Sequence, residues 1–205
     1  MNRIFAKIKN QMKIETIILA GGQSSRMGKD KALLNIDGKT FITHLYNQVT
    51  LFSEKVHITT PWQEKYLNLV PQNCHFINEL EPHQGPLSAL VQSFDYVQTE
   101  WVFLVACDMP FIEAKTIMLW QEQLLHLQSE TIAFLAQDKL ERWQCLCGFY
   151  KCSGAQSARQ YLQTGKKSFQ GWLKTVPVAK IHQNDDRIFY NCNTPEEYQR
   201  LLNAQ

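Results

Sequence analysis

The chain has 205 residues, 44% of them hydrophobic, and 21 basic side chains nearly balance 19 acidic ones. This length and composition provide for one sizeable core, so we expect a single domain over residues 1–205. A net charge of +2 with interspersed signs argues against nucleic acid or an anionic membrane as a partner. The sequence contains neither an apolar run of membrane-spanning length nor the apolar core of a signal peptide, so we expect a cytoplasmic protein.

The N-terminal segment and the cysteines give little information about function. The pattern of the first predicted strand begins after Met12, and residues 1–11 are therefore interpreted as a dispensable lead. Six cysteines are scattered along the chain, and Cys145 and Cys147 are separated by one residue instead of the two typical of metal or redox pairs. A reducing compartment opposes disulfides, so we predict free thiols.

Predicted strands and helices alternate along the chain. Apolar runs and alternation predict strands at 16–19, 55–60, 74–78, 100–108, 131–135, 144–150 and 178–181. Helical spacing predicts helices at 40–49, 63–69, 88–98, 113–127, 155–162, 167–174 and 194–202. The near-continuous apolar run at 101–107 indicates a strand that is covered on both faces. The alternation predicts a three-layer α/β/α fold with an open, mostly parallel sheet.

The stretch 16–34 changes from a β-branched strand to a polar loop with two adjacent glycines, Gly21 and Gly22. Such a loop can bring backbone N–H groups close to an anion, and Arg26 and Lys31 add positive charge. The spacing matches neither a Walker loop nor the GxGxxG pattern of dinucleotide-binding proteins. The loop predicts a phosphate-binding site, while a glycine turn with solvated lysines is the plainer interpretation.

Asp108 follows the clearest predicted strand. In open α/β sheets ligands bind beyond the carboxyl ends of the strands, where Gly21 and Gly22 are also expected. A carboxylate there suits Mg²⁺, which keeps several waters and needs few protein ligands. Asp108 is therefore a candidate metal ligand, and a turn or helix-capping aspartate is the alternative.

The loop also carries a family signature. Leu-Ala-Gly-Gly at 19–22 is followed by Arg-Met-Gly at 26–28, Asp-Lys at 30–31 and two leucines at 33–34. In these segments the chain resembles the molybdenum cofactor guanylyltransferases, the MobA family. Cytidylyltransferases and sugar-phosphate nucleotidyltransferases are similar in part of the motif. The resemblance implies a Rossmann-like nucleotidyltransferase fold.

The resemblance also implies roles for individual residues. Arg26, Lys31 and Asp108 correspond to catalytic residues, and Asp108, within Cys-Asp-Met-Pro, corresponds to the residue that binds the metal. The implied nucleotide-binding residues are Leu19, Ala20, Gly21, Gly22, Lys31, Asn78 and Asp108.

Three asparagines are further candidate contacts for the substrates. Counting back from the Gly-Pro-Leu element at 85–87, Asn78 falls where many members of the family carry an aspartate that contacts the nucleotide. An amide lacks the negative charge that favours pairing with the N1–H and amine of guanine. Asn191 and Asn193 resemble the asparagines that face the acceptor in the family, although a strand end with a helix cap would use the same sequence.

The resemblance implies a guanylyltransferase that uses Mg²⁺. It would transfer GMP from GTP to the molybdopterin-type molybdenum cofactor and release pyrophosphate. The expected partners are GTP, that cofactor and proteins that deliver or receive it. One alternative is a related enzyme that uses CTP or a sugar-phosphate acceptor. Another is a nucleotide-binding regulatory module without catalysis.

Overall fold

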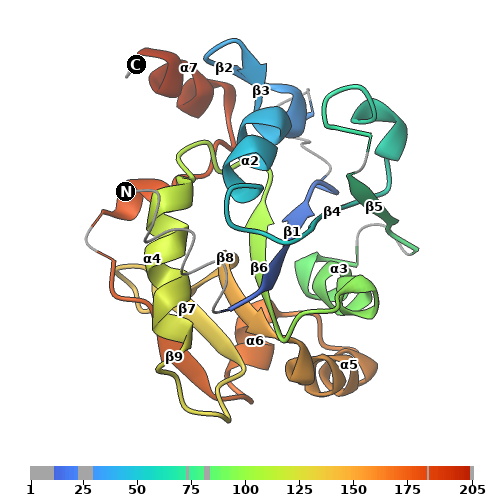
Figure 1. The fold of residues 1–205 in the computed structure, drawn as a ribbon, viewed down its shortest axis with the longest axis vertical. Coiled ribbons are helices and arrows are strands. Elements are labelled where there is room, and N and C mark those ends of the chain that lie inside the picture. Colours follow the sequence, from blue (N-terminus) through green and yellow to red (C-terminus); the bar gives the residue numbers. More distant parts are fainter. Residues whose placement is uncertain (1–11, 23–29, 73, 81–83, 184, 204–205) are drawn as a thin grey trace.

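A seven-stranded sheet forms the centre of the protein, in the order β5-β4-β1-β6-β8-β7-β9 (Figure 1). The computed structural model describes residues 12–22, 30–72, 74–80, 84–183 and 185–203. The strands of the sheet are β1 (Ile14–Leu19), β4 (Val56–Thr60), β5 (His75–Asn78), β6 (Trp101–Ala106), β7 (Ala133–Gln137), β8 (Trp143–Lys151) and β9 (Val178–Lys180).

The sheet is mostly parallel, as predicted. Among the described residues β8 alone runs antiparallel, and it lies between β6 and β7. A tight turn at 138–142 joins β7 to β8, with Glu141 at a φ of 59°. A turn of this length can only join antiparallel neighbours, because parallel strands need a longer crossover. A separate small hairpin, β2 (Asn35–Ile36) with β3 (Lys39–Thr40), forms where the sequence predicts only a turn.

The helices follow the predicted pattern with local differences. They are α2 (Phe41–Val49), α3 (Pro86–Ser93), α4 (Ala114–Leu124), α5 (Ala155–Gln163), α6 (Phe169–Leu173) and α7 (Pro195–Asn203). The predicted helix at 63–69 is shorter, with one 3-10 turn at Gln63–Lys65. Helix α3 begins at Pro86, two residues before its predicted start, because proline suits the first turn of a helix.

Two hydrophobic layers enclose the sheet, which gives the predicted three-layer architecture. One layer packs α2 and α4 against Ile14 and Ile18 of β1 and against Phe103 of β6. The opposite layer packs α3, α5 and α6 against Ile17 and the alternate residues of β6. Figure 1 shows these two groups of helices on opposite sides of the sheet. The alternation follows from the strand geometry, in which successive side chains point to opposite faces.

A third, smaller cluster fixes the C-terminal segment over one end of the sheet. Cys192 and Leu201 pack against Leu34, Ile36 and Phe41. Figure 1 shows the resulting position of α7 beside β2 and β3. This packing holds residues 191–193 close to the end of β6.

The lead segment 1–11 lies outside the described residues. At its border, the backbone oxygen of Met12 accepts a hydrogen bond from Nε2 of Gln121 on α4 at 2.7 Å. All six cysteines are free thiols, as predicted. Within the described part of the chain, helices are too short or too polar to cross a membrane.

Candidate active site

A cavity of about 280 Å³ lies where β1 and β6 end. This is the edge at which open α/β sheets bind their ligands. The loop after β1, the end of β6, the start of α3, one residue of β8 and the segment before α7 all contribute. The lining residues are Leu19, Gly21, Gly22, Glu79, Gly85, Pro86, Ala89, Ala106, Cys107, Asp108, Leu146, Asn191 and Asn193.

Lys31 joins two distant segments at this cavity. Its Nζ donates to Oδ2 of Asp108 at 3.0 Å and to Oδ1 of Asn193 at 2.6 Å. The side chains of Lys31 and Asp108 are each 17% exposed, so the ion pair is partly shielded from water. Partial burial strengthens such a pair compared with one on the open surface. The three residues form a polar junction beside the cavity.

Backbone hydrogen bonds hold the strand ends that carry the site. Cys107 donates its N–H to the carbonyl of Leu19 at 3.0 Å, which ties the end of β6 to the end of β1. Cys192 donates its N–H to the carbonyl of Asp108, also at 3.0 Å. Asp108 is therefore fixed by its backbone between β1 and the segment before α7.

Asp30 and Tyr66 support the turn that presents Lys31. Oδ1 of Asp30 accepts the N–H of Ala32 and caps the 3-10 turn Lys31–Leu33. Oδ2 of Asp30 accepts the hydroxyl of Tyr66 at 2.8 Å. Tyr66 is fully buried, and burial raises its pKa, so the hydroxyl stays protonated and keeps donating. This arrangement fixes the turn before ligands bind.

Glu79 is a site residue that the sequence reasoning missed. A Cβ atom on Gly21 would lie 2.0 Å from Oε1 of Glu79, so the carboxylate rests directly against the glycine backbone. Asn78, the predicted base contact, is exposed, and its backbone carbonyl accepts a hydrogen bond from Gln92 at 2.6 Å. Asn78 is not among the lining residues, whereas Glu79 is. The available signal was the carboxylate of Glu79, which directly follows Asn78 in the sequence.

Asn191 and Asn193 line the cavity, and the predicted helix cap forms directly after them. Oε2 of Glu197 accepts the N–H groups of Asn193 and Thr194, and Thr194 in turn caps α7. The side chains of Thr194 and Glu197 thus form the capping box with backbone N–H groups, and neither asparagine side chain takes part in it. Oδ1 of Asn191 is buried without a hydrogen-bond partner among the described residues. A ligand that donates a hydrogen bond to this oxygen would remove the free-energy cost of burying it without a partner.

The structure brings most predicted site residues together. Leu19, Gly21, Gly22, Asp108, Asn191 and Asn193 line the cavity, and Lys31 contacts two of them. Ala20 is buried beneath the loop, where Thr60 donates to its carbonyl at 3.0 Å. Arg26 lies outside the described residues, as does the rest of 23–29. The individual roles of these residues remain predictions.

The donor set suits a magnesium ion that is shared with a substrate. Across the residues that can be described, three or more His, Cys, Asp or Glu side chains never converge as a metal cage. Asp108 supplies one hard carboxylate at the cavity. Mg²⁺ is commonly bound by one or two carboxylates together with substrate phosphates and water. Burial, together with the neighbouring Asp108, raises the pKa of Cys107, so its thiol stays protonated and is a poor metal ligand.

Comparison with known proteins identifies the family. Residues 16–180 match the model of the MobA-like NTP transferase domain. The chain belongs to this family. A probable molybdenum cofactor guanylyltransferase from Trichormus variabilis is 39% identical to this MobA-like protein over 184 residues, which cover 90% of this chain and 88% of the relative. The resemblance found in the sequence is confirmed.

Solved structures share the fold of this MobA-like domain. Molybdopterin-guanine dinucleotide biosynthesis protein A from Archaeoglobus fulgidus superposes with a TM-score of 0.77 at 17% identity, covering 94% of this chain and 100% of that one. The 2-C-methyl-D-erythritol 4-phosphate cytidylyltransferase from Thermus thermophilus gives 0.65 at 12% identity, covering 95% and 100%. The Rossmann-like nucleotidyltransferase fold is thereby confirmed. It also occurs in a cytidylyltransferase, so the fold alone leaves the nucleotide open.

Proposed function

We propose that this protein transfers GMP from GTP to the terminal phosphate of a molybdopterin-type molybdenum cofactor and releases pyrophosphate. The junction of Lys31, Asp108 and Asn193 is the observation that carries the proposal, because it sets a cation and a carboxylate side by side at the sheet edge. Family membership and the relative named as a probable guanylyltransferase support the choice of GTP and of this acceptor.

The chemical step needs positioning more than proton transfer. An oxygen of the acceptor phosphate attacks the α-phosphorus of GTP and forms a new P–O bond. The bond from the α-phosphorus to the α–β bridging oxygen breaks, and pyrophosphate leaves with that electron pair. A phosphate monoester is largely ionised at neutral pH, so a dedicated general base is unnecessary. The protein contributes by holding both substrates in line and by neutralising charge.

Lys31 and the glycine loop are placed for that neutralisation. The ammonium of Lys31 lies between Asp108 and Asn193, where it can approach triphosphate oxygens. Gly21 and Gly22 line the same cavity, and their backbone N–H groups would suit the triphosphate. Arg26, in the same loop of the sequence, is proposed as a further cation toward the triphosphate.

Asp108 would hold the divalent ion, for which we propose Mg²⁺. When bound, the ion neutralises charge on the triphosphate oxygens. The backbone of Asp108 is held near the end of β6 by the hydrogen bond that its carbonyl accepts from Cys192, and its carboxylate is paired with Lys31.

Base recognition is assigned to Glu79. Glu79 lines the cavity and its carboxylate lies against Gly21, whereas Asn78 is exposed and does not line the cavity. A carboxylate can accept two parallel hydrogen bonds from the N1–H and the amine of guanine. Adenine and cytosine each present one amine next to a ring nitrogen that is a hydrogen-bond acceptor. The lone pair of that nitrogen would face the second carboxylate oxygen and be repelled by it. The pairing would therefore favour GTP.

The purified protein, incubated with Mg²⁺, molybdopterin and either GTP or CTP, provides the direct test. We expect pyrophosphate release with GTP, and a product whose mass equals the acceptor plus GMP. A product whose mass equals the acceptor plus CMP would identify the enzyme as a cytidylyltransferase. Nucleotide binding without pyrophosphate release, under conditions where molybdopterin also binds, would show a regulatory module.

A further inference from the structure

A second hollow of about 550 Å³ is lined by the turn between β7 and β8, by Gln144 of β8 and by residues of the segment 186–190. Leu146 of β8 lines the active-site cavity, and Gln144, two residues earlier on the same strand, lines the second hollow. Residues two apart on a strand point to the same face, so the two hollows share one surface of β8. Tyr190, which lines the second hollow, also directly precedes Asn191, which lines the active-site cavity. We call the second hollow the β8 groove.

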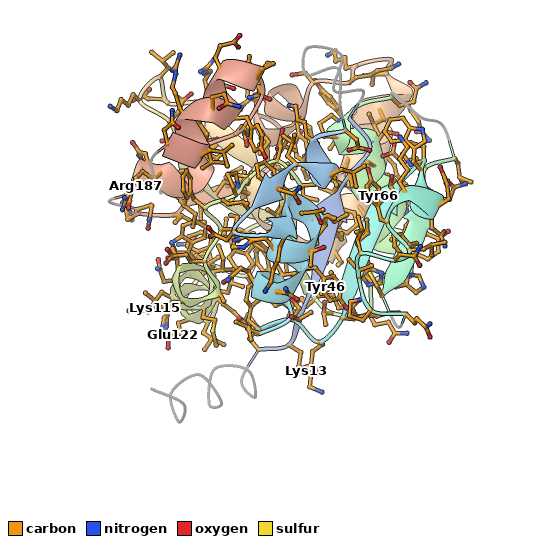
Figure 2. All side chains as sticks on the ribbon, turned by 90° about the horizontal axis from the view of Figure 1, so that it is seen from above. Lys13, Tyr46, Tyr66, Lys115, Glu122 and Arg187 are labelled. Carbon is orange, nitrogen blue, oxygen red and sulfur yellow. The ribbon has the colours of Figure 1, made fainter. Side chains whose placement is uncertain are left out.

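The β8 groove has a polar, partly basic lining. It includes the cations of Lys139, Arg142 and Arg187, the carboxylates of Asp138 and Asp186, and the amide of Gln144 on β8. Arg142 is paired with Asp138 at 2.8 Å, and its side chain is 66% exposed. Arg187, labelled at the periphery in Figure 2, is paired with Asp185. Such a lining suits a ligand that combines anionic groups with hydrogen-bonding edges.

The order of strands places this groove on the side where a second substrate must enter. The loop with Gly21 and Gly22 follows β1, Asp108 follows β6, and β8 is the next strand beyond. In-line transfer requires the attacking oxygen and the leaving pyrophosphate on opposite sides of the α-phosphorus. If the pyrophosphate lies over the β1 loop, the attacking phosphate must lie beyond Asp108, toward β8.

An unsatisfied atom lies at Asn191, the cavity residue that follows Tyr190 of the β8 groove. Oδ1 of Asn191 is buried, and within the described ranges it lacks a hydrogen-bond partner. Asn191 lines the active-site cavity, and its neighbour Tyr190 lines the β8 groove. A ligand that extends from one hollow into the other would pass this oxygen and could donate a hydrogen bond to it.

We propose that the β8 groove binds the body of the acceptor, a flat, hydrogen-bonding heterocycle that carries the attacking phosphate. Gln144 offers both a donor and an acceptor to the edge of the ring, and Arg142 offers a cation to its anionic substituents. This inference rests on the proposed function, because it assumes that the second substrate is a phosphate-bearing acceptor. It makes Arg142 and Gln144 determinants of acceptor specificity.

Two variants test the groove, Gln144→Ala and Arg142→Gln. Loss of one such hydrogen bond should raise the KM for molybdopterin about five- to tenfold, while the KM for GTP stays unchanged. The 138–142 turn should persist in Arg142→Gln, because Asp138 still accepts the N–H groups of Leu140 and residue 142. Arg142→Lys keeps the charge and should restore part of the affinity.

Arg159→Gln is the matched control, since Arg159 also forms an exposed pair with an aspartate, Asp95, but on α5. It should leave both KM values unchanged. If both groove variants kept the wild-type KM for molybdopterin, or raised the KM for GTP equally, the inference would be overturned.

Equilibrium binding of molybdopterin, in the presence of a non-hydrolysable GTP analogue, separates this inference from the proposed function. If Gln144→Ala and Arg142→Gln weaken molybdopterin binding, but the wild-type protein transfers no GMP, the groove is retained and the proposed reaction is refuted. Transfer in the wild type with unaltered binding in both variants would retain the reaction and refute the groove. Failure of the wild type to bind molybdopterin would refute both.

Discussion

Nζ of Lys31 lies 3.0 Å from Oδ2 of Asp108, although 77 positions separate the two residues in the sequence. The same nitrogen lies 2.6 Å from Oδ1 of Asn193, a further distant residue. Three chain segments thus meet at one ammonium group beside the cavity. The charges on Lys31 and Asp108 compensate each other before any substrate binds, so neither is buried alone.

Removal of the Asp108 carboxylate should abolish most of the activity and leave the fold intact. We expect Asp108→Asn to lower kcat/KM by about 100-fold or more, as for other groups that organise charge in the transition state. The melting temperature should fall by less than about 4 °C, because one partly exposed ion pair is lost. Pyrophosphate release at varied Mg²⁺ and thermal unfolding measure the two effects. Asp95→Asn is the control, and wild-type activity in Asp108→Asn would disprove the metal role.

Lys31 and Asp108 should act as one unit. Lys31→Met keeps most of the side-chain length and removes the charge, and we expect a loss in kcat/KM similar to that of Asp108→Asn. The double variant should then lose little more than either single variant, since residues of one network are not additive. A double-mutant cycle on kcat/KM measures this coupling. Fully additive losses would show that the 3.0 Å contact has no part in turnover.

Glu79 should determine the preference for guanine. Glu79→Gln replaces a charged acceptor with a neutral amide, and we expect the ratio of kcat/KM for GTP over ATP to fall about tenfold. Asn78→Asp is the matched variant at the adjacent position, and it should leave that ratio unchanged because Asn78 is exposed. A raised GTP preference in Asn78→Asp, with a flat response in Glu79→Gln, would return the role to Asn78.

A methyl group at Gly21 should disturb nucleotide binding through Glu79. The added Cβ of Gly21→Ala would lie 2.0 Å from Oε1 of Glu79, and the end of that side chain must move. We expect a higher KM for GTP with little change in thermal stability, because a flexible side chain yields more easily than backbone. Gly22→Ala is the control, since its Cβ would meet nothing within 4 Å among the described residues. Equal effects of both substitutions would mean that the close contact at Gly21 is irrelevant.

A buried carboxylate far from the cavity should make stability depend on pH. Oε2 of Glu15 lies 2.5 Å from Nε2 of His57, and Oε1 accepts the N–H of Gln98 at 2.9 Å. Burial alone would raise the pKa of Glu15, but these hydrogen bonds outweigh it and hold the pKa below its ordinary value. The stabilisation is therefore present above the ordinary pKa of about 4.3 and is lost as the pH falls through the lower, folded-state pKa.

Glu15→Gln should flatten this dependence. At neutral pH we expect it to lower the free energy of unfolding by about 2 kcal/mol, because the buried imidazole of His57 loses a charged hydrogen-bond partner. Below about pH 4 the difference from the wild type should shrink. Urea unfolding across this pH range measures both effects. Glu54→Gln removes a more exposed carboxylate as the control, and a constant difference at all pH values would contradict the assignment.

Local signals were sufficient for the fold class and for the β1 loop. Apolar periodicity located the strands and helices, because burial on one or two faces imposes a fixed spacing on the sequence. The adjacent Gly21 and Gly22 indicated the loop that lines the cavity, and Thr194 with Glu197 predicted the start of α7. These features depend on neighbours within a few residues, which the sequence displays directly.

The tertiary structure alone decided which side chains share the cavity. The contact of Lys31 with Asp108 and Asn193 depends on sheet order and on the packing of α7, neither of which has a local signature. Counting from Gly85 selected Asn78, yet Glu79 faces the cavity. Successive side chains of a strand point in opposite directions, so an error of one residue reverses the orientation. At the end of β5, only the path of the backbone determines whether Asn78 or Glu79 points into the cavity.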